Sequence, residues 1–257
     1  MDRTLLTPPM IETFRTCRQA YQYAFLGSEE RVEPVSSVCK RFLLKALSEI
    51  NRGRIATVNQ VQKFMGQHWP VDKIGQQEGV KAFLFVYKTL TNYVANPYKP
   101  GGGEIVGASL KVRARVPHIR VYLEDTLDLI IWYPQAQKLE FVDVHVQPLR
   151  PLNPAWPSPS ILVKQFLAER LQSRWTFEQL DMTFVRLGPN GATPVSFTLD
   201  DGLYRLHWPE LLKIVEEMKD PDSFSAHPSQ LCDRCEFAAR CPAVGGCGTA
   251  QSLSRSA

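Results

Sequence analysis

The segment LCDRCEFAARC, residues 231–241, contains three of the six cysteines in this 257-residue chain. Cys232, Cys235 and Cys241 follow the spacing C-x2-C-x5-C, which indicates thiolates that share a metal site. Unrelated buried thiols are the alternative, and three cysteines this close make it the weaker one. Zinc and an iron–sulfur cluster both fit the spacing, and each requires a fourth thiolate.

The fourth thiolate has to come from one of the three remaining cysteines. Cys247 lies in the glycine-rich segment GGCGTAQSLSRSA, which we expect to be a flexible tail at 245–257 that folds back at little cost. Cys17 and Cys39 each lie on the apolar stripe of an expected helix, where a core cysteine is the usual explanation. The residues alone therefore leave the fourth ligand open.

The bulk composition is that of an ordinary globular protein, with 44% hydrophobic and 22% charged residues. The net charge of +4 permits a polyanionic partner without requiring one. The N-terminus has no apolar targeting region and no apolar run is long enough to span a membrane, so we expect a cytoplasmic protein with no membrane partner. Reduced cysteines in that compartment favour metal binding over disulfide bonds.

Hydrophobic periodicity divides the chain into a helical N-terminal half, a strand core that contains one helix, and the cysteine segment. The expected helices cover 7–25, 35–50, 79–96, 161–173 and 203–218, and the expected strands cover 105–116, 118–133, 138–146, 180–188 and 193–199.

Two segments resemble a known superfamily. TPPMIETFRTCRQAYQYAF, residues 7–25, is similar to the opening of the RecB-like and AddB-like nucleases of the PD-(D/E)XK superfamily, in which a cysteine is followed by aromatic residues. FSAHPSQLCDRCEFAARCP, residues 224–242, is similar to their C-terminal segment, with Phe237 after the second cysteine and Pro242 after the third. The resemblance extends over nearly the whole chain in motif order.

The resemblance implies the fold and the cysteine ligands. The expected fold is α/β of PD-(D/E)XK (restriction-endonuclease-like) type, a mixed-sheet core flanked by helices in a single domain at 1–244. A helical insertion is expected at 28–100 and an iron–sulfur clasp at 228–244. In iron–sulfur members of the family, one cysteine of the first helix joins three near the end. The implied ligands of a [4Fe–4S] cluster, with zinc as the alternative, are Cys17, Cys232, Cys235 and Cys241.

The strands 118–133 and 138–146 carry the acidic residues that the superfamily uses for metal binding. Strand alternation puts Glu124 and Asp128 on one face, with Leu127 and Leu129 on the other. It likewise puts Asp143 and His145 on a common face. Solvent-facing residues of amphipathic strands are the alternative, and the residues alone favour it.

The resemblance turns these carboxylates into a metal site. Asp128 takes the place of the aspartate of Gly-x-x-Asp, and Asp143 and His145 take the place of Asp/Glu-x-Lys. Asp128 and Asp143 are the implied ligands of Mg²⁺ or Mn²⁺, with Glu124 as an outer carboxylate.

The site departs from the family pattern in several places. His145 replaces the usual lysine, and Lys164 on the next helix is a candidate for the missing cation. The glycine before the first aspartate is Asp125, and the motif Gln-x-x-x-Tyr is only half present, as Gln165. Cys39 takes a position that is often histidine, and Ala108 or Ser109 stands where an upstream glutamate is expected.

A basic stripe on the strand 105–116 is a candidate nucleic-acid contact. Alternation puts Lys111, Arg113 and Arg115 on one face, which suits a phosphate backbone and equally suits charge protection of an edge strand. The leading hypothesis is an iron–sulfur DNA nuclease that acts on ends or single strands in repair or recombination. The alternatives are an inactive relative that binds DNA or serves as a subunit of a helicase–nuclease, and a zinc-clasped interaction protein.

Overall fold

The structure is a computed structural model. It describes residues 4–27, 35–74, 76–98, 101–145, 157–188, 191–220 and 224–245. Cys247 and residues 246–257 of the expected tail lie outside this described part.

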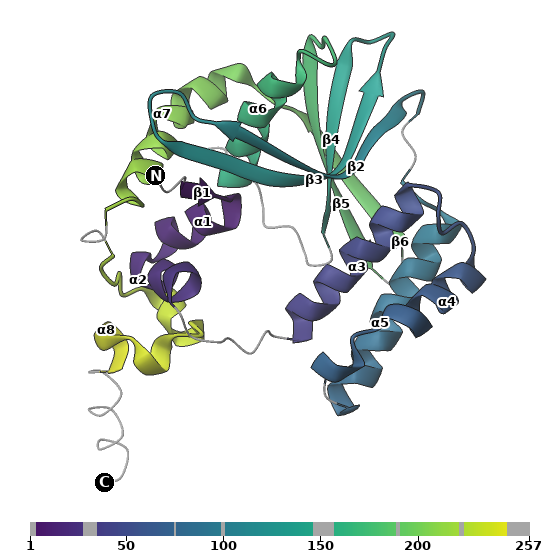
Figure 1. The fold of residues 1–257 in the computed structure, drawn as a ribbon, viewed down its shortest axis with the longest axis horizontal. Helices are drawn as coiled ribbons and strands as arrows, with labels where there is room; N and C mark the ends of the chain where they lie inside the picture. Colours follow the sequence, from purple (N-terminus) through teal and green to yellow (C-terminus); the bar gives the residue numbers. More distant parts are fainter. Residues whose placement is uncertain are drawn as a thin grey trace.

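A six-stranded mixed sheet forms the centre of the fold (Figure 1). The strands are β1 (Thr4–Leu6), β2 (Glu104–Arg115), β3 (Val121–Tyr133), β4 (Lys138–His145), β5 (Gln179–Gly188) and β6 (Gly191–Thr198). The order is β1-β3-β4-β5-β6, with β2 paired to β3 as well. The pairs β1–β3 and β4–β5 are parallel, and the others are antiparallel.

Helices cover both faces of this sheet (Figure 1). The α-helices are α1 (Pro8–Thr16), α2 (Arg18–Tyr21), α3 (Val35–Asn51), α4 (Val58–His68), α5 (Gln76–Ala95), α6 (Pro159–Leu171), α7 (Asp201–Glu217) and α8 (Pro242–Gly245). The prediction of a mixed sheet flanked by helices is confirmed. The sequence analysis did not predict β1 or α4. None of the described helices has the length and apolarity needed to cross a bilayer.

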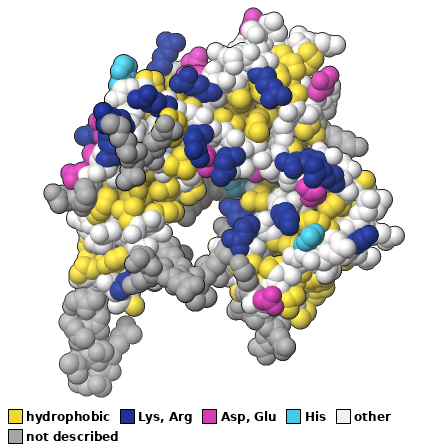
Figure 2. Space-filling model, viewed as in Figure 1, with side chains coloured by type: hydrophobic (Ala, Val, Ile, Leu, Met, Phe, Trp, Pro, Cys, Tyr) yellow, Lys and Arg dark blue, Asp and Glu magenta, His cyan; other side chains and the backbone are white. Residues whose placement is uncertain are grey.

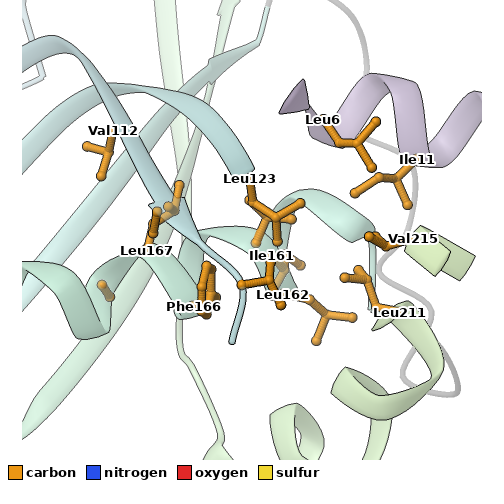
Figure 3. Packing of buried hydrophobic residues seen from close by; sticks show 14 of the residues in the cluster. Leu6, Ile11, Val112, Leu123, Ile161, Leu162, Phe166, Leu167, Leu211 and Val215 are labelled. Carbon is orange, nitrogen blue, oxygen red and sulfur yellow. The ribbon is translucent and has the colours of Figure 1, made fainter. Parts of the chain in front are cut away.

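Two hydrophobic clusters hold the layers together. Cluster one joins α1, α6 and α7 to one face of the sheet, and Figure 3 shows α6 between β3 and the helices α1 and α7. Cluster two joins α3, α4 and α5 to the other face. The strand β4 shows the division, because Leu139 and Phe141 pack in cluster one while Val142 and Val144 pack in cluster two.

Among the described residues, the middle of β3 has no strand partner on one edge. Because β2 pairs with Tyr122 through Trp132, both β1 and β4 must use the opposite edge. There β1 pairs as far as Leu123, and β4 pairs only from Leu129 onward. In the described part of the chain, residues 124–128 therefore face an opening in the sheet.

The first predicted helix is broken. Cys17 ends α1 and precedes α2 in an extended conformation, with φ −160° and ψ 114°, and a π-helical turn follows at Gln22–Leu26. The break turns the N-terminal segment toward the C-terminal one, and the two lie side by side in Figure 1. The Tyr23 and Phe237 rings are 5.6 Å apart, and Arg240 lies over the Tyr23 ring.

A buried carboxylate fixes the first half of β4. Glu140, only 4% exposed, accepts hydrogen bonds from the hydroxyls of Tyr98 at 2.8 Å, Tyr133 at 2.6 Å and Thr183. These donors come from three different segments, so hydrogen bonds join β4 to the residues after α5, to β3 and to β5. Burial, together with the hydrogen bond to Glu140, raises the pKa of Tyr98 to about 12.

We predict that Glu140→Ala lowers the free energy of unfolding by about 3 kcal/mol or more, because the hydroxyls of Thr183, Tyr98 and Tyr133, which are buried or partly buried, lose their carboxylate acceptor. Chemical denaturation measures the change, and Glu104→Ala on the exposed start of β2 is the control. Equal stability of the two variants would show that the hydroxyls find other acceptors.

Candidate active site

A slip in strand alternation brings two aspartates of β3 to the same side. Leu127 packs in cluster one and Leu129 in cluster two, although alternation predicts a common face. Ile130 then packs in cluster one, so the side chains change register between Leu127 and Leu129. Asp125 and Asp128, three residues apart, consequently line the same cavity.

The neighbouring strand β2 changes register at the same level. Ala108 packs against cluster two and Leu110 against cluster one. Ser109 between them has φ 48°, the left-handed region that non-glycine residues rarely adopt. It lies opposite Asp128 and lines the same cavity, so the irregularity of both strands coincides with the candidate site.

Asp128 also marks the point where β3 and β4 separate. Its Oδ2 accepts a hydrogen bond of 2.8 Å from the Val144 backbone N–H, beyond the end of the ladder at Leu129 and Val142. Asp143 and His145 flank Val144 and line the cavity. The structure therefore brings together the three predicted residues Asp128, Asp143 and His145.

Lys164 completes the site from α6. Its Nζ lies 2.5 Å from Asp125 Oδ2 and 3.0 Å from Asp143 Oδ2, and it donates a 2.8 Å hydrogen bond to Ser160 Oγ. Lys164 is only 3% exposed, because every residue from Ile161 to Ala168 is buried. The structure therefore places the Lys164 ammonium in the same cavity as Asp128 and Asp143.

The charges of the site perturb one another. Burial, followed by repulsion from Asp143, raises the pKa of Asp128 to about 7. Burial also raises the pKa of Asp143. Burial alone would lower the pKa of Lys164, but the carboxylates of Asp143 and Asp125 outweigh it and raise that pKa, so the ammonium stays charged.

His145 is a neutral group in this setting. Burial is the main cause that lowers its pKa, and the positive charges of Lys40 and Lys164 act in the same direction against the attraction of Asp143. Its ring lies edge-on to Phe184, with centroids 5.2 Å apart. His145 can thus serve as a base or a metal ligand, whereas Lys164 supplies the cation.

The cavity has a volume of about 720 Å³, and residues from both halves of the chain line it. Besides the residues above, it is lined by the start of α1 and by one side of α3. Figure 2 shows Lys and Arg side chains on both sides of a hollow between α3 and the sheet. The lining residues of α3 are Lys40, Leu44, Lys45, Ser48 and Glu49, and Arg52 follows directly after the helix.

Two unsatisfied atoms fit a divalent cation. Asp143 Oδ1 and His145 Nε2 are buried without a hydrogen-bond partner among the described residues, and a carboxylate oxygen and, in one tautomer, an imidazole nitrogen can each bind a metal. In the described part, no three His, Cys, Asp or Glu side chains converge closely enough to hold a metal as they stand. The ammonium of Lys164 lies between two of the carboxylates, Asp125 and Asp143.

Glu124 and the basic stripe lie apart from the cavity. Glu124 is opposite Arg113 in the β2–β3 register and pairs with it at 2.6 Å and with Lys111 at 3.2 Å. These ion pairs keep its pKa low despite its burial. Neither Glu124 nor Lys111, Arg113 and Arg115 line the cavity that holds Asp128, so the expectation of a shared opening is wrong.

Gln165 also points elsewhere. Its Nε2 donates a 3.0 Å hydrogen bond to Asp201 on α7, and it lines a separate cavity of about 580 Å³. Sequence reasoning missed Asp125, because its role depends on the slip of β3. It also missed Ser160, although the spacing of Ser160 and Lys164 along a helix could have indicated the pair.

The predicted cluster ligands line one small cavity of about 20 Å³ between the chain ends. All are free thiols, and the Ser229 N–H donates to Cys232 Sγ at 3.3 Å. The chemistry of this donor set fits a thiolate-bound metal group, although the sulfurs do not converge as they stand. Cys39 packs instead against cluster two. The cysteines that line the cavity are Cys17, Cys232, Cys235 and Cys241.

Comparisons with known proteins find structural similarity alone. No protein-family model matches the chain, and no curated protein matches its sequence. The chain is similar to the crystal structure of a "Putative exonuclease" from Eubacterium rectale, with a TM-score of 0.47 and 9% identity over 91% of this chain and 87% of that one. It is also similar to the crystal structure of SSO0001, with a TM-score of 0.35 and 12% identity over 79% and 96%. At these values neither similarity assigns a function.

We predict that Asp128→Asn stabilises the protein above pH 7 when a chelator is present. Because folding raises the pKa of Asp128 to about 7, its contribution to stability is present below about pH 4 and is lost as pH rises through 7. The variant should therefore gain on the order of 2–4 kcal/mol at pH 8 and nothing at pH 4, since one pKa unit corresponds to about 1.4 kcal/mol.

Chemical denaturation across this pH range measures the effect. Asp181→Asn is the control with the opposite sign, because hydrogen bonds and Lys138 lower the pKa of Asp181. That variant should lose stability at neutral pH. Loss of stability in Asp128→Asn at pH 8 would contradict a raised pKa of Asp128.

Proposed function

We propose that this chain is a divalent-metal-dependent nuclease of PD-(D/E)XK type that hydrolyses phosphodiester bonds of DNA, at ends or in single strands. The observation that carries the proposal is the convergence of Lys164 on the carboxylates of Asp125 and Asp143, in a cavity shared with Asp128 and His145. Carboxylates, a neutral imidazole and a buried ammonium are groups that can support such a hydrolysis.

The metal ligands in this proposal are Asp128, Asp143 and His145. A bound Mg²⁺ or Mn²⁺ would polarise the phosphodiester and activate water for attack. The unsatisfied Asp143 Oδ1 and His145 Nε2 support this ligand set. An imidazole ligand favours Mn²⁺ over Mg²⁺.

Lys164 takes the electrostatic role that His145 cannot fill. A charged ammonium can donate hydrogen bonds to the phosphate oxygens on which negative charge develops. Asp125 and Ser160 hold its Nζ from two directions, so the donor is oriented before substrate arrives. Lys164 lies within ion-pair distance of Asp143, which places its donor beside a proposed metal ligand.

The second candidate is an inactive relative that binds DNA or serves as a subunit of a helicase–nuclease. Two observations favour it: histidine stands in the place of the strand lysine, and Lys164 already pairs with Asp143, a carboxylate that a metal would need. Either protein would act in cytoplasmic DNA repair or recombination, alone or with a helicase.

We expect wild-type protein to degrade a single-stranded oligonucleotide with Mn²⁺ and more slowly with Mg²⁺. Lys164→Met should lower the rate about 100-fold or more, which is the usual cost of one preorganised donor. It should still bind Mn²⁺, because the lost ammonium competes for the same carboxylates, and a metal-dependent rise in Tm would report that binding.

The matched control is Lys138→Met on β4, a lysine that pairs with Asp181 outside the cavity. Asp143→Asn should abolish both cleavage and the rise in Tm. Absence of cleavage by wild type with either metal would leave the inactive DNA-binding relative as the function.

We further propose that Cys17, Cys232, Cys235 and Cys241 hold a [4Fe–4S] cluster, with a zinc clasp as the alternative. A group bound there would join the two chain ends, so its binding energy would add to folding stability. The support is the common cavity and the packing of Tyr23 against Phe237 beside it.

Under this proposal, anaerobically purified protein is brown and contains about four iron atoms per chain. Cys17→Ser should remove the iron and lower Tm, whereas Cys39→Ser in α3 should do neither. Stoichiometric zinc in a colourless protein would support the clasp instead. Iron retained by Cys17→Ser would exclude Cys17 as a ligand.

A further inference from the structure

One face of α3 forms a wall of the cavity that holds the catalytic carboxylates. Lys40, Leu44, Ser48 and Arg52 recur at intervals of four residues, which puts them on one side of the helix. Lys45 lies beside them and also lines the cavity. This helix comes from the expected insertion, far in sequence from the strands that carry the carboxylates.

The cations of this wall are available to a ligand. Lys40 and Lys45 are exposed, and neither has an ion-pair partner within the described residues. Lys45 lies over the Phe64 ring, with Nζ 5.8 Å from its centroid. The one acidic residue of the wall, Glu49, has Arg54 at 3.2 Å, so it does not neutralise the lysines.

Arg52 shows that the wall is anchored to the sheet. Its guanidinium donates a 2.8 Å hydrogen bond to the Ala108 carbonyl of β2, next to Ser109 in the cavity. Its contact with Glu49 is longer, at 3.8 Å. The end of α3 is therefore held at the level where β2 and β3 change register.

The basic stripe of β2 is a poorer anion site. Lys111 and Arg113 both pair with the buried Glu124, which must lose these partners if they turn to phosphate. Binding at Lys40 and Lys45 has no such cost. The comparison shifts the expected nucleic-acid surface from β2 to α3.

We propose that Lys40, Lys45 and Arg52 bind the phosphate backbone of a single nucleic-acid strand, whose next phosphate lies over Asp128 and Asp143. The proposal deepens the proposed function and rests on it for the position of the scissile phosphate. A cavity of about 720 Å³ is the size of a small-ligand pocket, so it admits part of one strand rather than a duplex. Contacts to phosphate alone give no sequence preference.

The test is the salt dependence of binding, measured with full-length protein and a fluorescent single-stranded oligonucleotide in a chelator, so that cleavage is absent. For single strands, each phosphate contact contributes about −0.7 to the slope of log K against log salt concentration. The double variant Lys40→Gln, Lys45→Gln should therefore have a slope less negative by about 1.4.

Two matched double variants interpret the result. Lys40→Arg, Lys45→Arg keeps the charges and should keep the wild-type slope. Lys111→Gln, Arg113→Gln removes the same charge from β2 and should also leave the slope unchanged. The three pairs consist of exposed side chains, and equal Tm values would show that each variant is folded.

An unchanged slope in Lys40→Gln, Lys45→Gln would overturn the proposal, as would a wild type that binds no single strand. A loss confined to the β2 variant would assign binding to β2. The wild type could show no cleavage while the Lys40→Gln, Lys45→Gln variant still has the weaker salt dependence. That result would support strand binding by α3 and contradict the nuclease function.

Discussion

The ammonium of Lys164, buried between Asp125 and Asp143, is the interaction on which the candidate site depends. Burying an ion costs several kcal/mol even after relaxation, so an isolated lysine at 3% exposure would lose its proton. Two unit charges 4 Å apart attract by about 4 kcal/mol at an effective dielectric constant of 20. Two carboxylates at 2.5 and 3.0 Å therefore offset the cost, and the ammonium remains.

The same balance explains why the aspartates tolerate one another. Asp128 adds a third carboxylate to the cavity, and one ammonium cannot neutralise all three. Burial, followed by repulsion from Asp143, raises the pKa of Asp128, and Lys164 and the Val144 N–H reduce this effect only in part. The three carboxylates can carry more negative charge than one ammonium neutralises. Such a site attracts a divalent cation.

Backbone irregularity puts these charges where they are. A regular β3 would send Asp125 and Asp128 to opposite faces, and a continuous ladder with β4 would leave no opening between them. The slip near Leu127, the left-handed Ser109 and the separation of β4 occur at one level of the sheet. Residues in strained or irregular backbone cluster at functional sites, where the surrounding core holds them in place.

The sequence was sufficient for the elements with strong periodicity. It predicted α3, α5, α6, α7 and the strands β2 to β6, because their apolar patterns match the two buried faces of the sheet. It also predicted that Asp143 and His145 share a face, since β4 is regular. It could not predict β1, because three residues form no pattern, nor the break at Cys17, because the residues on both sides have good helical periodicity.

The misplacement of Glu124 has the same physical origin. Alternation assigned it to the face of Asp128, and the slip of β3 separates the two. Glu124 is then left opposite Arg113, and the cross-strand ion pair satisfies both. A local break in strand alternation cannot be detected from the sequence pattern, because the residues at the break are as apolar or as acidic as their neighbours.

The position of Lys164 on a helix rather than on a strand changes what holds the cation of the candidate site. A strand lysine at the position of His145 would be held by the β4–β5 ladder alone, because the β3–β4 ladder ends before the site, at Leu129 and Val142. The helix α6 is buried over its whole middle, and its position is fixed by β3, α1 and α7 together (Figure 3). A long side chain on such an element is placed by core packing, which is the more rigid support at a point where the sheet itself opens.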